Sequence, residues 1–561
     1  MDYQPRLDDI GHILHTVLQA PAALQSLPPF AEVDADLVQQ VLDEAGKFVA
    51  SEIAPLQRVG DEVGCRFEAG QVTSPPGFAQ AYRHFWEGGW PALACEVQDG
   101  GQGLPTVLEA VLYEMLSAAN HGWTMAPGLL HGAYECLRHH GSEDLKARYL
   151  SKIATGEWLA TMCLTEPHAG SDLGLARTRA QPQGDAYAIS GTKIFISGGE
   201  HDLSENIVHL VLARLPDAAP GPKGLSLFLA PKFLPDGSRN SVHCERIEEK
   251  MGLHGSPTCV MRFDQATGWL VGEPHRGLNA MFVMMNAARL HVSLQGLGLL
   301  EAAWQKAQAY AQERRQMRAP GPRLDNEPAD LIARHPAMQR ILNTQRAWID
   351  GGRVLGYRTA VELDLIKHHP DPQRRVEAQR WCSLVTPVIK AAFTHQAFHG
   401  ASECLQVFGG HGYVREWGIE QIVRDARVSM IYEGTNEIQA IDLLVRKVVP
   451  DGAQALGDLL QSLATELGPQ ARETCERLVT LQALATDVAQ AAAHNAELPL
   501  RVADDFLRAT ALALLDWAWQ RIAAAPQADP GRWQAPAAAL ADWVLPEFDM
   551  RVQIMRRALA A

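Results

Sequence analysis

The sequence predicts a mainly α protein with a small β domain in its middle, and two patterns in the 561-residue chain predict it. Apolar residues recur at helical spacing in the first part of the chain and again after residue 276, as Leu290, Leu294 and Leu297 illustrate. Between these parts the apolar runs are short and are separated by Gly, Pro, Asp and Ser, which is typical of strands. Because one hydrophobic core rarely serves more than about 300 residues, we expect roughly three or four domains.

The N-terminal part is predicted to be helical. Residues 1–34 form an extension with a short helix, Ile10 to Ala20, which Pro21 should end. Residues 35–157 follow as an all-helical domain, because apolar residues return at helical spacing. Its further helices are expected at 76–89, 108–119 and 142–155.

Residues 158–275 are predicted to form the middle β domain. The runs suited to strands are 159–164, 187–189, 193–196, 207–212, 225–229 and 258–263. Strands at this spacing, with no helix between them, favour a small antiparallel barrel or sandwich.

The rest of the chain is predicted to be helical again. Residues 276–450 should form a four-helix bundle, with a Pro-rich break at 318–327. The expected helices of this bundle are Gly277–Arg315, His335–His368, Asp371–Phe408 and one that follows Glu437. The Ala- and Leu-rich residues 451–561 are predicted to form an additional helical domain.

Composition narrows the class of protein. The formal net charge of −15 argues against a chain that binds nucleic acid. The nine scattered cysteines, with no Cys-x-x-Cys pair, predict neither disulfides nor a metal site. The first residues lack the basic and apolar regions of a signal peptide, and no apolar run is long enough for a membrane span. We therefore expect a soluble cytoplasmic protein.

Four segments carry residue types suited to a bound ligand. In 162–172, hydroxyls and backbone N–H groups after a strand can bond a heterocycle and a pyrophosphate, although an ordinary polar turn has the same residues. Phe195 is either a core residue of a strand or a ring that packs against a cofactor. Arg314 ends a long helix, where a cation stabilises the helix or reaches a phosphate. The glycines of Gln406–Tyr413 either cap a helix or let the backbone approach a ligand.

The candidate catalytic residue is Glu433, in the segment Ile431-Tyr432-Glu433-Gly434-Thr435-Asn436-Glu437-Ile438-Gln439. Considered alone, this carboxylate would be interpreted as a helix N-terminal residue, placed for capping and dipole reasons. Together with the other segments, it is better interpreted as a catalytic base.

These segments resemble the acyl-CoA dehydrogenase family, and the resemblance covers nearly the whole chain. Its most specific motifs are Thr165-Glu166-Pro167-His168-Ala169-Gly170-Ser171-Asp172 and Ile431-Tyr432-Glu433-Gly434-Thr435, with Gln406-Val407-Phe408-Gly409-Gly410 between them. The N-terminal extension and the C-terminal helices look like the larger branch of the family. That branch includes 3-methylmercaptopropionyl-CoA dehydrogenases and broad-range mycobacterial relatives.

The resemblance implies FAD as the cofactor, bound between the β domain and the bundle. Thr165 would meet the flavin near its N5 edge, and Ser171 would contact the FAD pyrophosphate or the acyl-CoA. Phe195 stands where relatives often carry Trp beside the flavin, and Ser197 where they often carry Thr. Arg314 would reach the adenosine diphosphate half of the FAD in a neighbouring subunit of a homodimer or a dimer of dimers. The other implied cofactor-binding residues are Met162, Leu164, Gln406, Gly410, Thr435 and Glu437, and the other implied substrate-binding residues are Asn286, Arg289 and Gly434.

The reaction implied by the resemblance is α,β-dehydrogenation of an acyl-CoA thioester to the 2-enoyl-CoA, a step of fatty acid β-oxidation. Glu433 would take the α-proton while a hydride leaves the β-carbon for flavin N5. The backbone amide of Glu433 and a flavin ribityl hydroxyl would bond the thioester oxygen. The electrons would pass to an electron-transfer flavoprotein.

Two other functions of the same family remain open at this point. An acyl-CoA oxidase performs the same dehydrogenation with oxygen as the acceptor, and it also carries extra C-terminal helices. An alkylation-response flavoprotein binds DNA through a basic C-terminal surface. In this chain only Arg551, Arg556 and Arg557 cluster at the end, and the acidic balance argues against DNA binding.

Overall fold

A computed structural model describes residues 2–468, 470–527 and 529–561, and its contacts divide the chain into two units. The helical unit comprises the residues up to 47 together with 110–118 and 292–561. The β-containing unit comprises residues 48–109 and 119–291. Two long helices, α6 (Thr106–Thr124) and α10 (Gly277–Glu313), contribute residues to both units.

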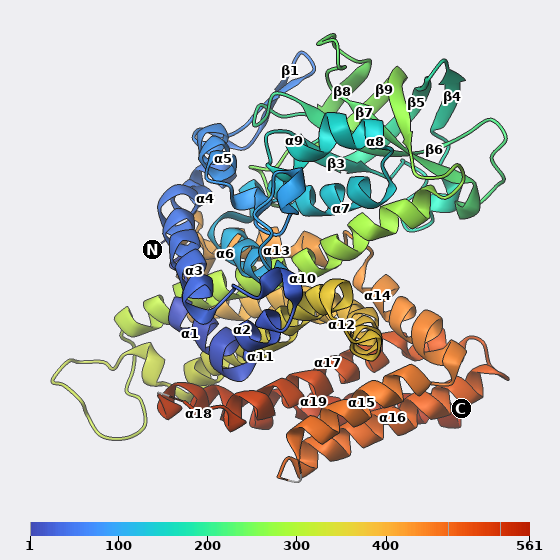
Figure 1. Cartoon of the computed structure of the whole chain (residues 1–561). Helices are drawn as coiled ribbons and strands as arrows, with labels where there is room; N and C mark the ends of the chain where they lie inside the picture. The colour runs from blue at the N-terminus through green and yellow to red at the C-terminus, as the bar shows by residue number, and fades with distance from the viewer. Residues whose placement is uncertain (1, 469, 528) are drawn as a thin grey trace. The chain divides into compact units, whose positions relative to one another are not determined.

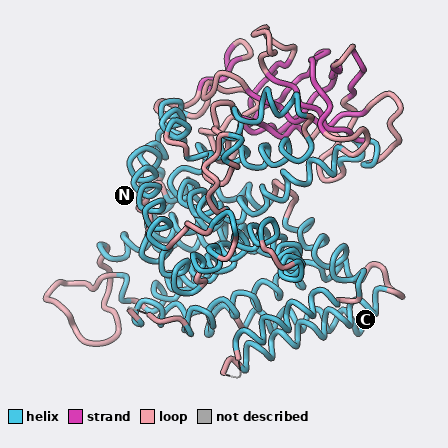
Figure 2. The backbone as a smooth tube through the Cα atoms, viewed as in Figure 1, coloured by secondary structure: helices cyan, strands magenta, loops and turns pink. Residues whose placement is uncertain are grey.

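The β-containing unit holds a sheet whose strand pairings close into a ring. In the described part of the chain, seven strands form this sheet (Figures 1 and 2). They are β3 (Leu159–Cys163), β4 (Arg179–Gln183), β5 (Ala186–Ser197), β6 (Ile207–Arg214), β7 (Leu225–Pro231), β8 (Val242–Ile247) and β9 (Thr258–Val271). The ring runs β6-β4-β5-β9-β7 and returns to β6, while β3 pairs with β6 and β8 with β9. The predicted small barrel is therefore confirmed.

The barrel is mixed, so the prediction of a purely antiparallel barrel was wrong. β3 and β4 both run parallel to β6. A parallel pair needs a long crossover connection, and residues 164–206 between β3 and β6 provide one.

Two strands of the sheet were not predicted, and their burial explains why. β4 buries only Ala180, and β8 buries only Val242 and Cys244. The exposed polar residues of both strands dilute their apolar signal. β6, by contrast, is buried from Ile207 to Ala213 and was predicted from its continuous apolar run.

The remainder of the β-containing unit is mainly helical. Its helices are α4 (Gln57–Val63), α5 (Phe78–Glu87), α7 (Leu130–His140), α8 (Glu143–Leu145) and α9 (Ser151–Ala154). The prediction of an all-helical N-terminal domain was wrong at one place, because β1 (Arg66–Glu68) and β2 (Gln71–Thr73) form an antiparallel hairpin. Ala69 and Gly70 both have positive φ angles, of 50° and 81°, and this two-residue turn sets the hairpin.

Four bundle helices of the helical unit agree with the helices that the sequence predicts, and a fifth, α13 (Ile419–Arg427), was not predicted. The four are α11 (Pro336–His368), α12 (Pro372–Val407), α14 (Asn436–Leu443) and the second part of α10. Gly351 and Gly352 lie inside α11 without ending it. They lie where other helices pack closely against it. A Cβ at Gly351 would lie 2.5 Å from Leu515, and one at Gly352 would lie 2.6 Å from Leu297.

The C-terminal helices pack on the bundle of the same unit (Figure 1). They are α15 (Gln454–Leu467), α16 (Arg472–Ala492), α17 (Leu498–Ala524), α18 (Pro530–Ala539) and α19 (Pro546–Ala560). In α15 the buried leucines fall at helical spacing, at positions 456, 459, 460, 463 and 467. α17 packs against α11 and α14, so these additional helices extend the core of the bundle.

The N-terminal extension differs from the prediction at Pro21. The chain forms α1 (Leu7–Gly11), continues as a wider helical turn to Val17 and breaks at Gln19, whose φ angle is 50°. Helix α2 (Ala20–Gln25) then begins. Pro21 therefore lies in the first turn of a helix instead of ending one, a position where its missing N–H leaves no bond unmade.

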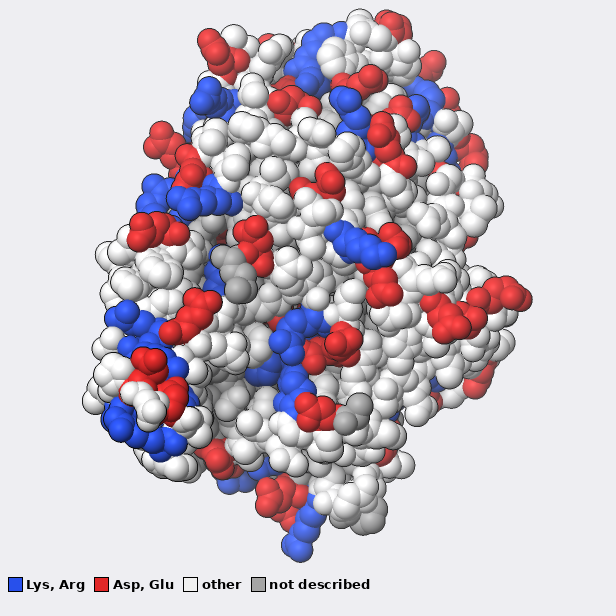
Figure 3. All heavy atoms as spheres, turned by 90° about the vertical axis from the view of Figure 1, so that its left-hand side faces the viewer, with Lys and Arg blue, Asp and Glu red and all other residues white. Residues whose placement is uncertain are grey.

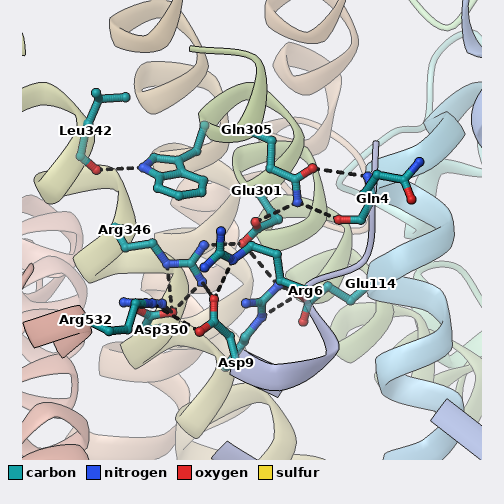
Figure 4. Close-up of polar contacts among 12 residues, drawn as sticks. Gln4, Arg6, Asp9, Glu114, Glu301, Gln305, Leu342, Arg346, Asp350 and Arg532 are labelled. Atoms are coloured by element: carbon teal, nitrogen blue, oxygen red, sulfur yellow. Dashed lines mark hydrogen bonds and ion pairs between the residues drawn. The ribbon is translucent and has the colours of Figure 1, made fainter. Parts of the chain in front are cut away.

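A buried network of charges joins the N-terminal extension to α10, α11 and α18, and Figure 4 shows its members pointing toward one another. Arg346 bonds Glu301 at 2.8 Å, and Arg532 bonds Asp350 at 2.8 Å and Asp9 at 3.1 Å. Burial would raise the pKa of Glu301, but Arg346 and Arg353 lower it. The Glu301 carboxylate therefore stays ionised inside the helical unit.

The surface carries mixed charges. Figure 3 shows one face of the molecule, on which Lys and Arg side chains lie among Asp and Glu side chains. Arg551, at the C-terminal end, pairs with Asp505 at 2.8 Å and with Glu547 at 3.0 Å. Among the residues that the structure describes, no helix combines the length and apolar character needed to cross a membrane.

Candidate active site

Glu433 lies in a strained turn between α13 and α14 of the helical unit. Its φ angle is 55°, and that of Gly434 is 82°. A left-handed conformation at a residue other than glycine costs about 1–3 kcal/mol and persists only where the surroundings impose it. The contacts around this turn must therefore hold Glu433 in place.

The N-cap of α14 is Thr435. Its hydroxyl accepts a hydrogen bond from the Ile438 amide at 3.3 Å, and a hydrogen bond from Thr435 lowers the pKa of Glu437. Glu433 precedes this cap, so the interpretation of Glu433 as the capping carboxylate was wrong.

A buried lysine holds the turn. Lys390, fully buried in α12, donates from Nζ to the Gly434 carbonyl at 2.8 Å and to Asn436 Oδ1 at 3.1 Å. The Thr394 hydroxyl donates to the same Asn436 oxygen at 3.1 Å. Helix α12 thus fixes both ends of the Gly434–Asn436 segment.

Two more hydrogen bonds fix the residues around Glu433. Gln439 donates from Nε2 to the Glu433 carbonyl at 3.1 Å. The Tyr432 hydroxyl donates to Gln295 Oε1 at 2.6 Å. Burial raises the pKa of Tyr432, so this phenol keeps its proton and remains a donor.

Three other predicted residues of the helical unit, Arg314, Gln406 and Gly410, are exposed. Arg314 directly follows α10, and its amide bonds the Tyr310 carbonyl. The Tyr310 ring stacks on Phe408, with the ring centroids 4.3 Å apart. This stacking brings the end of α10 to the glycine segment that follows α12.

In the β-containing unit, Met162, Leu164 and Thr165 lie at the end of β3. The Ile194 amide donates to the Thr165 carbonyl at 2.9 Å, and Lys193 donates from Nζ to the Leu164 carbonyl at 3.0 Å. Strand β5 therefore holds the segment of Thr165 against the residues next to Phe195.

Glu166 organises the loop that follows. It accepts hydrogen bonds from Lys193 Nζ at 2.8 Å, from the Thr178 hydroxyl at 2.6 Å and from the Arg177 amide at 2.7 Å. Burial alone would raise the pKa of Glu166, but the Lys193 ammonium group and these hydrogen bonds lower it to about 2. The carboxylate is thus an ionised structural anchor.

Phe195 is exposed, so its interpretation as a core strand residue was wrong. Its side chain is 60% exposed and its φ angle is 59°. The register of β5 against β9 shifts between Lys193 and Ile196, and this bulge turns the ring outward. The pairing resumes at Ile196, opposite Cys259, and Ser197 lies opposite Thr258.

The predicted substrate-binding residues of the β-containing unit lie at two places. Ser171 is exposed in the loop that precedes the helical turn Leu173–Leu175. Asn286 and Arg289 lie one turn apart on α10, where Arg289 Nη1 donates to Asn286 Oδ1 at 3.4 Å. The candidate residues therefore divide between the two units, with Glu433, Gly434, Thr435, Glu437, Arg314, Gln406 and Gly410 in the helical unit.

The charged residues that hold these segments were not predicted from the sequence. Lys390 stands alone in the apolar run Val388–Phe393, and a lone charge in a buried helix is a signal that could have found it. Glu166 and Lys193 were present in the chosen segments, but their mutual contact depends on the pairing of β5 and cannot be inferred from spacing.

Family models match most of the chain. Residues 36–157 match the acyl-CoA dehydrogenase N-terminal domain, 161–266 the middle domain and 275–447 the C-terminal domain. The chain is 43% identical to a 3-methylmercaptopropionyl-CoA dehydrogenase of Ruegeria pomeroyi, over 86% of this chain and 84% of that protein. It is 36% identical to the broad-specificity linear acyl-CoA dehydrogenase FadE5 of Mycobacterium tuberculosis, over 82% and 78%.

Solved structures share the fold. Caenorhabditis elegans ACDH-11, in complex with C11-CoA, superposes with a TM-score of 0.76 and 21% identity, over 99% of this chain and 96% of that chain. An acyl-CoA dehydrogenase of Bacillus anthracis, complexed with FAD, gives a TM-score of 0.76 and 20% identity, over 98% and 92%. The predicted mainly α fold with a middle β domain is confirmed.

Proposed function

This chain belongs to the acyl-CoA dehydrogenase family, and we propose that it uses FAD to convert an acyl-CoA into the 2-enoyl-CoA. The observation that carries the proposal is the Glu433 turn. A carboxylate stands there in a left-handed conformation that a buried lysine and a buried glutamine hold. Strained residues that the surrounding structure holds in this way are typical of catalytic positions.

The residues of the chain suit FAD as the cofactor. An outward-facing Phe195 ring next to the fixed Thr165 segment offers an apolar surface beside hydrogen-bonding groups. We propose flavin contacts at Met162, Leu164, Thr165, Phe195, Ser197, Thr435 and Glu437. Gly410 is exposed and a Cβ there would meet nothing within 4 Å, which would let a phosphate approach the backbone. When bound, FAD supplies at N5 the acceptor for the hydride that leaves the β-carbon.

Glu433 acts as the base in this proposal. Its carboxylate takes the proton from the α-carbon, which is acidic only when the thioester carbonyl is polarised. The backbone amide of Glu433 supplies one donor to that carbonyl oxygen. Both functions need a fixed turn, which the bond from Lys390 to the Gly434 carbonyl supports.

Replacement of Glu433 tests the assignment of the base. Glu433→Gln should retain yellow, bound FAD but lose flavin bleaching by acyl-CoA, by a factor of about 10³ or more under anaerobic conditions. Glu416→Gln, which changes an exposed carboxylate after α12, is the matched control. Bleaching of Glu433→Gln at a rate near that of the wild type would exclude Glu433 as the base.

The acyl group is best identified by a panel of thioesters. The similarity to the Ruegeria pomeroyi protein supports 3-methylmercaptopropionyl-CoA as the first substrate to try, and the similarity to FadE5 supports linear acyl-CoAs of several lengths. Anaerobic flavin reduction by each thioester gives a rate and a KM. Asn286, Arg289, Ser171 and Gly434 are the proposed contacts of the substrate.

We propose an electron-transfer flavoprotein as the acceptor of the electrons, and oxygen as the alternative. Stopped-flow reoxidation of the reduced enzyme in air separates the two. Slow reoxidation supports the flavoprotein, and rapid formation of hydrogen peroxide identifies an oxidase. The net charge of −15 and the pairing of Arg551 with Asp505 and Glu547 favour either acceptor over a DNA-binding function.

We also propose that the protein assembles from several subunits and works in a reducing compartment. The exposure of Arg314, Gln406 and Gly410 supports a homodimer or a dimer of dimers in which these residues contact FAD of the neighbouring subunit. Arg314→Ala should then release FAD on dilution, as measured by flavin fluorescence, and unchanged retention would exclude the contact. All nine cysteines are free thiols in the described residues, which favours a reducing compartment such as the cytoplasm.

A further inference from the structure

A buried cluster of one glutamate and two histidines joins α6, α7 and α10 inside the β-containing unit. Glu109 Oε2 lies 3.2 Å from His131 Nδ1 and 3.9 Å from His291 Nε2. All three side chains are buried, and each comes from a different helix. The proposed base, flavin contacts and substrate contacts include none of them. Because a buried charge is costly, such a cluster indicates a specific role.

His131 carries the positive charge of the cluster. Burial would lower its pKa, but Glu109, a hydrogen bond with Cys95 and the nearby Glu135 raise it well above its ordinary value. Burial lowers the pKa of His291, although Glu109 opposes this effect. Glu109 therefore links a charged imidazolium on α7 to a neutral imidazole on α10.

Helix α7 lies close to the first part of α10. The Cys136 thiol donates to the Ala280 carbonyl at 3.4 Å. One turn earlier on α7, Gly132 faces Met284, and a Cβ on this glycine would lie 2.9 Å from the Met284 side chain. These contacts advance along α10 toward His291, so the buried cluster continues the same row.

The face of α10 that packs on α7 lies opposite the proposed substrate contacts. With about 3.6 residues per turn, Met284 and His291 share one side of α10, and Asn286 and Arg289 lie on the other side. Met284 and His291 are buried, whereas Asn286 is exposed. His291 Nδ1 also bonds the Gly128 carbonyl at 3.3 Å, just before α7. A shift of α10 along its axis or a rotation would therefore break these contacts and displace both substrate contacts.

We propose that Glu109 and His131 form a positioning pair that fixes residues 284–291 of α10 and thereby sets the affinity for acyl-CoA, an inference that rests on the proposed function. A buried ion pair with its hydrogen bonds fits one arrangement of the helices. Met284, the apolar contact of the same row, is a flexible side chain that adapts to small shifts. The polar cluster is thus the part of the row that selects a single position of α10.

Steady-state kinetics of the FAD-loaded protein test the proposal. Glu109→Gln should raise the KM for acyl-CoA about tenfold with little change in kcat, because the segment carries substrate contacts and not the base. The double variant Glu109→Gln/His131→Gln should recover part of this loss, since it leaves no buried imidazolium without its carboxylate. Glu143→Gln, which changes an exposed carboxylate at the start of α8, is the matched control.

Hydrogen exchange gives a second measurement, which needs no substrate. In Glu109→Gln the backbone amides of residues 284–291 should exchange about tenfold faster than in the wild type, while those of α12 should keep their rates. Glu109→Asp keeps the charge but shortens the side chain. It should show the same two effects to a smaller extent, and it replaces Glu109→Gln if that variant does not fold.

Two outcomes would overturn the proposal. One is an unchanged KM in Glu109→Gln. The other is equally faster exchange in residues 284–291 and in α12, which would give the cluster a role in overall stability only. A wild-type protein that protects residues 284–291 from exchange, and loses this protection in Glu109→Gln, but reduces its flavin with no acyl-CoA would contradict the proposed function alone.

Discussion

The ammonium group of Lys390 holds the backbone that follows Glu433 by hydrogen bonds. It is fully buried in α12, and its hydrogen bonds go to the Gly434 carbonyl and to Asn436. A buried charge is costly unless it is well bonded, so its presence in an apolar stretch indicates a specific task. We infer that Lys390 is a positioning residue for the proposed base.

Lys390→Met should lower the rate of flavin reduction at saturating acyl-CoA by more than about tenfold, because the Glu433 turn loses its main support. The variant should also lose about 1–3 kcal/mol of stability, since two buried oxygen atoms lose a donor. Stopped-flow reduction well below the unfolding temperature measures the first effect. Lys447→Met, which removes a bond to the Ser383 carbonyl and an ion pair with Asp442, is the control. A purely structural role would leave the saturated rate unchanged.

Gly434 is the second residue on which the turn depends. An alanine there would adopt a φ angle of 82° and place Cβ 2.7 Å from Gln439 Nε2. Gly434→Ala should therefore displace Gln439 and cost more than the roughly 1–2 kcal/mol of left-handed strain. Gly452→Ala has a φ angle of 67° with nothing near its Cβ, so it measures the strain alone. Equal losses of unfolding free energy for Gly434→Ala and Gly452→Ala, measured in urea, would show that the clash with Gln439 contributes nothing.

At the scale of the elements, the contact of Glu166 with Lys193 joins the loop after β3 to β5. The pKa of Glu166 is about 2 in the folded protein, below its ordinary 4.5. A lowered carboxyl pKa contributes stability above pH 4.5 and loses it as the pH falls toward 2.

Glu166→Gln should therefore be less stable than the wild type by about 3 kcal/mol at pH 6. The difference should shrink as the pH falls from about 4.5 toward 2, where the wild-type carboxyl also becomes neutral. Urea unfolding of both proteins across this range measures it. A difference that stays constant with pH would show that the charge of Glu166 contributes nothing.

The elements also show what the sequence can predict. The long helices α10, α11 and α12 were predicted nearly to their ends, because their apolar period continues over many turns. β4 and β8 were missed because their burial depends on the pairing partners, and the hairpin of β1 and β2 was missed because its strands are short.

At the candidate site, the sequence motifs led to the right segments but not to their local geometry. The exposure of Phe195 follows from a bulge in the pairing of β5 with β9, which a single strand cannot reveal. The position of Glu433 before the cap follows from the choice of Thr435 as N-cap, a residue type that is favoured there. Neither fact is encoded in residue spacing.

At the scale of the whole chain, its first and last parts meet in the helical unit through buried charges. Arg532 of α18 bonds both Asp9 and Asp350, and Arg346 bonds Glu301 beside them (Figure 4). The C-terminal helices are therefore part of the core of this unit.

Arg532→Met should lower the free energy of unfolding by about 1–3 kcal/mol, because the buried Asp9 and Asp350 each lose one arginine partner and keep Arg346. Arg472→Met, which breaks an exposed pair with Glu476, should cost far less, because exposed ion pairs contribute little to stability. Denaturation by urea compares the two. Adding Asp9→Asn to Arg532→Met should recover part of the loss, and its failure to do so would contradict the electrostatic cause.

The same network has a consequence for how the protein is made. Asp9 and Arg532 are 523 positions apart, so Asp9 emerges from the ribosome long before Arg532 is synthesised. The residues of the β-containing unit have all been translated by then and can fold during synthesis. The helical unit must wait until α18 has been synthesised, and until then its N-terminal helices are candidates for capture by chaperones. A ribosome that stalls before α18 would leave a nascent chain with one finished unit and one that cannot close.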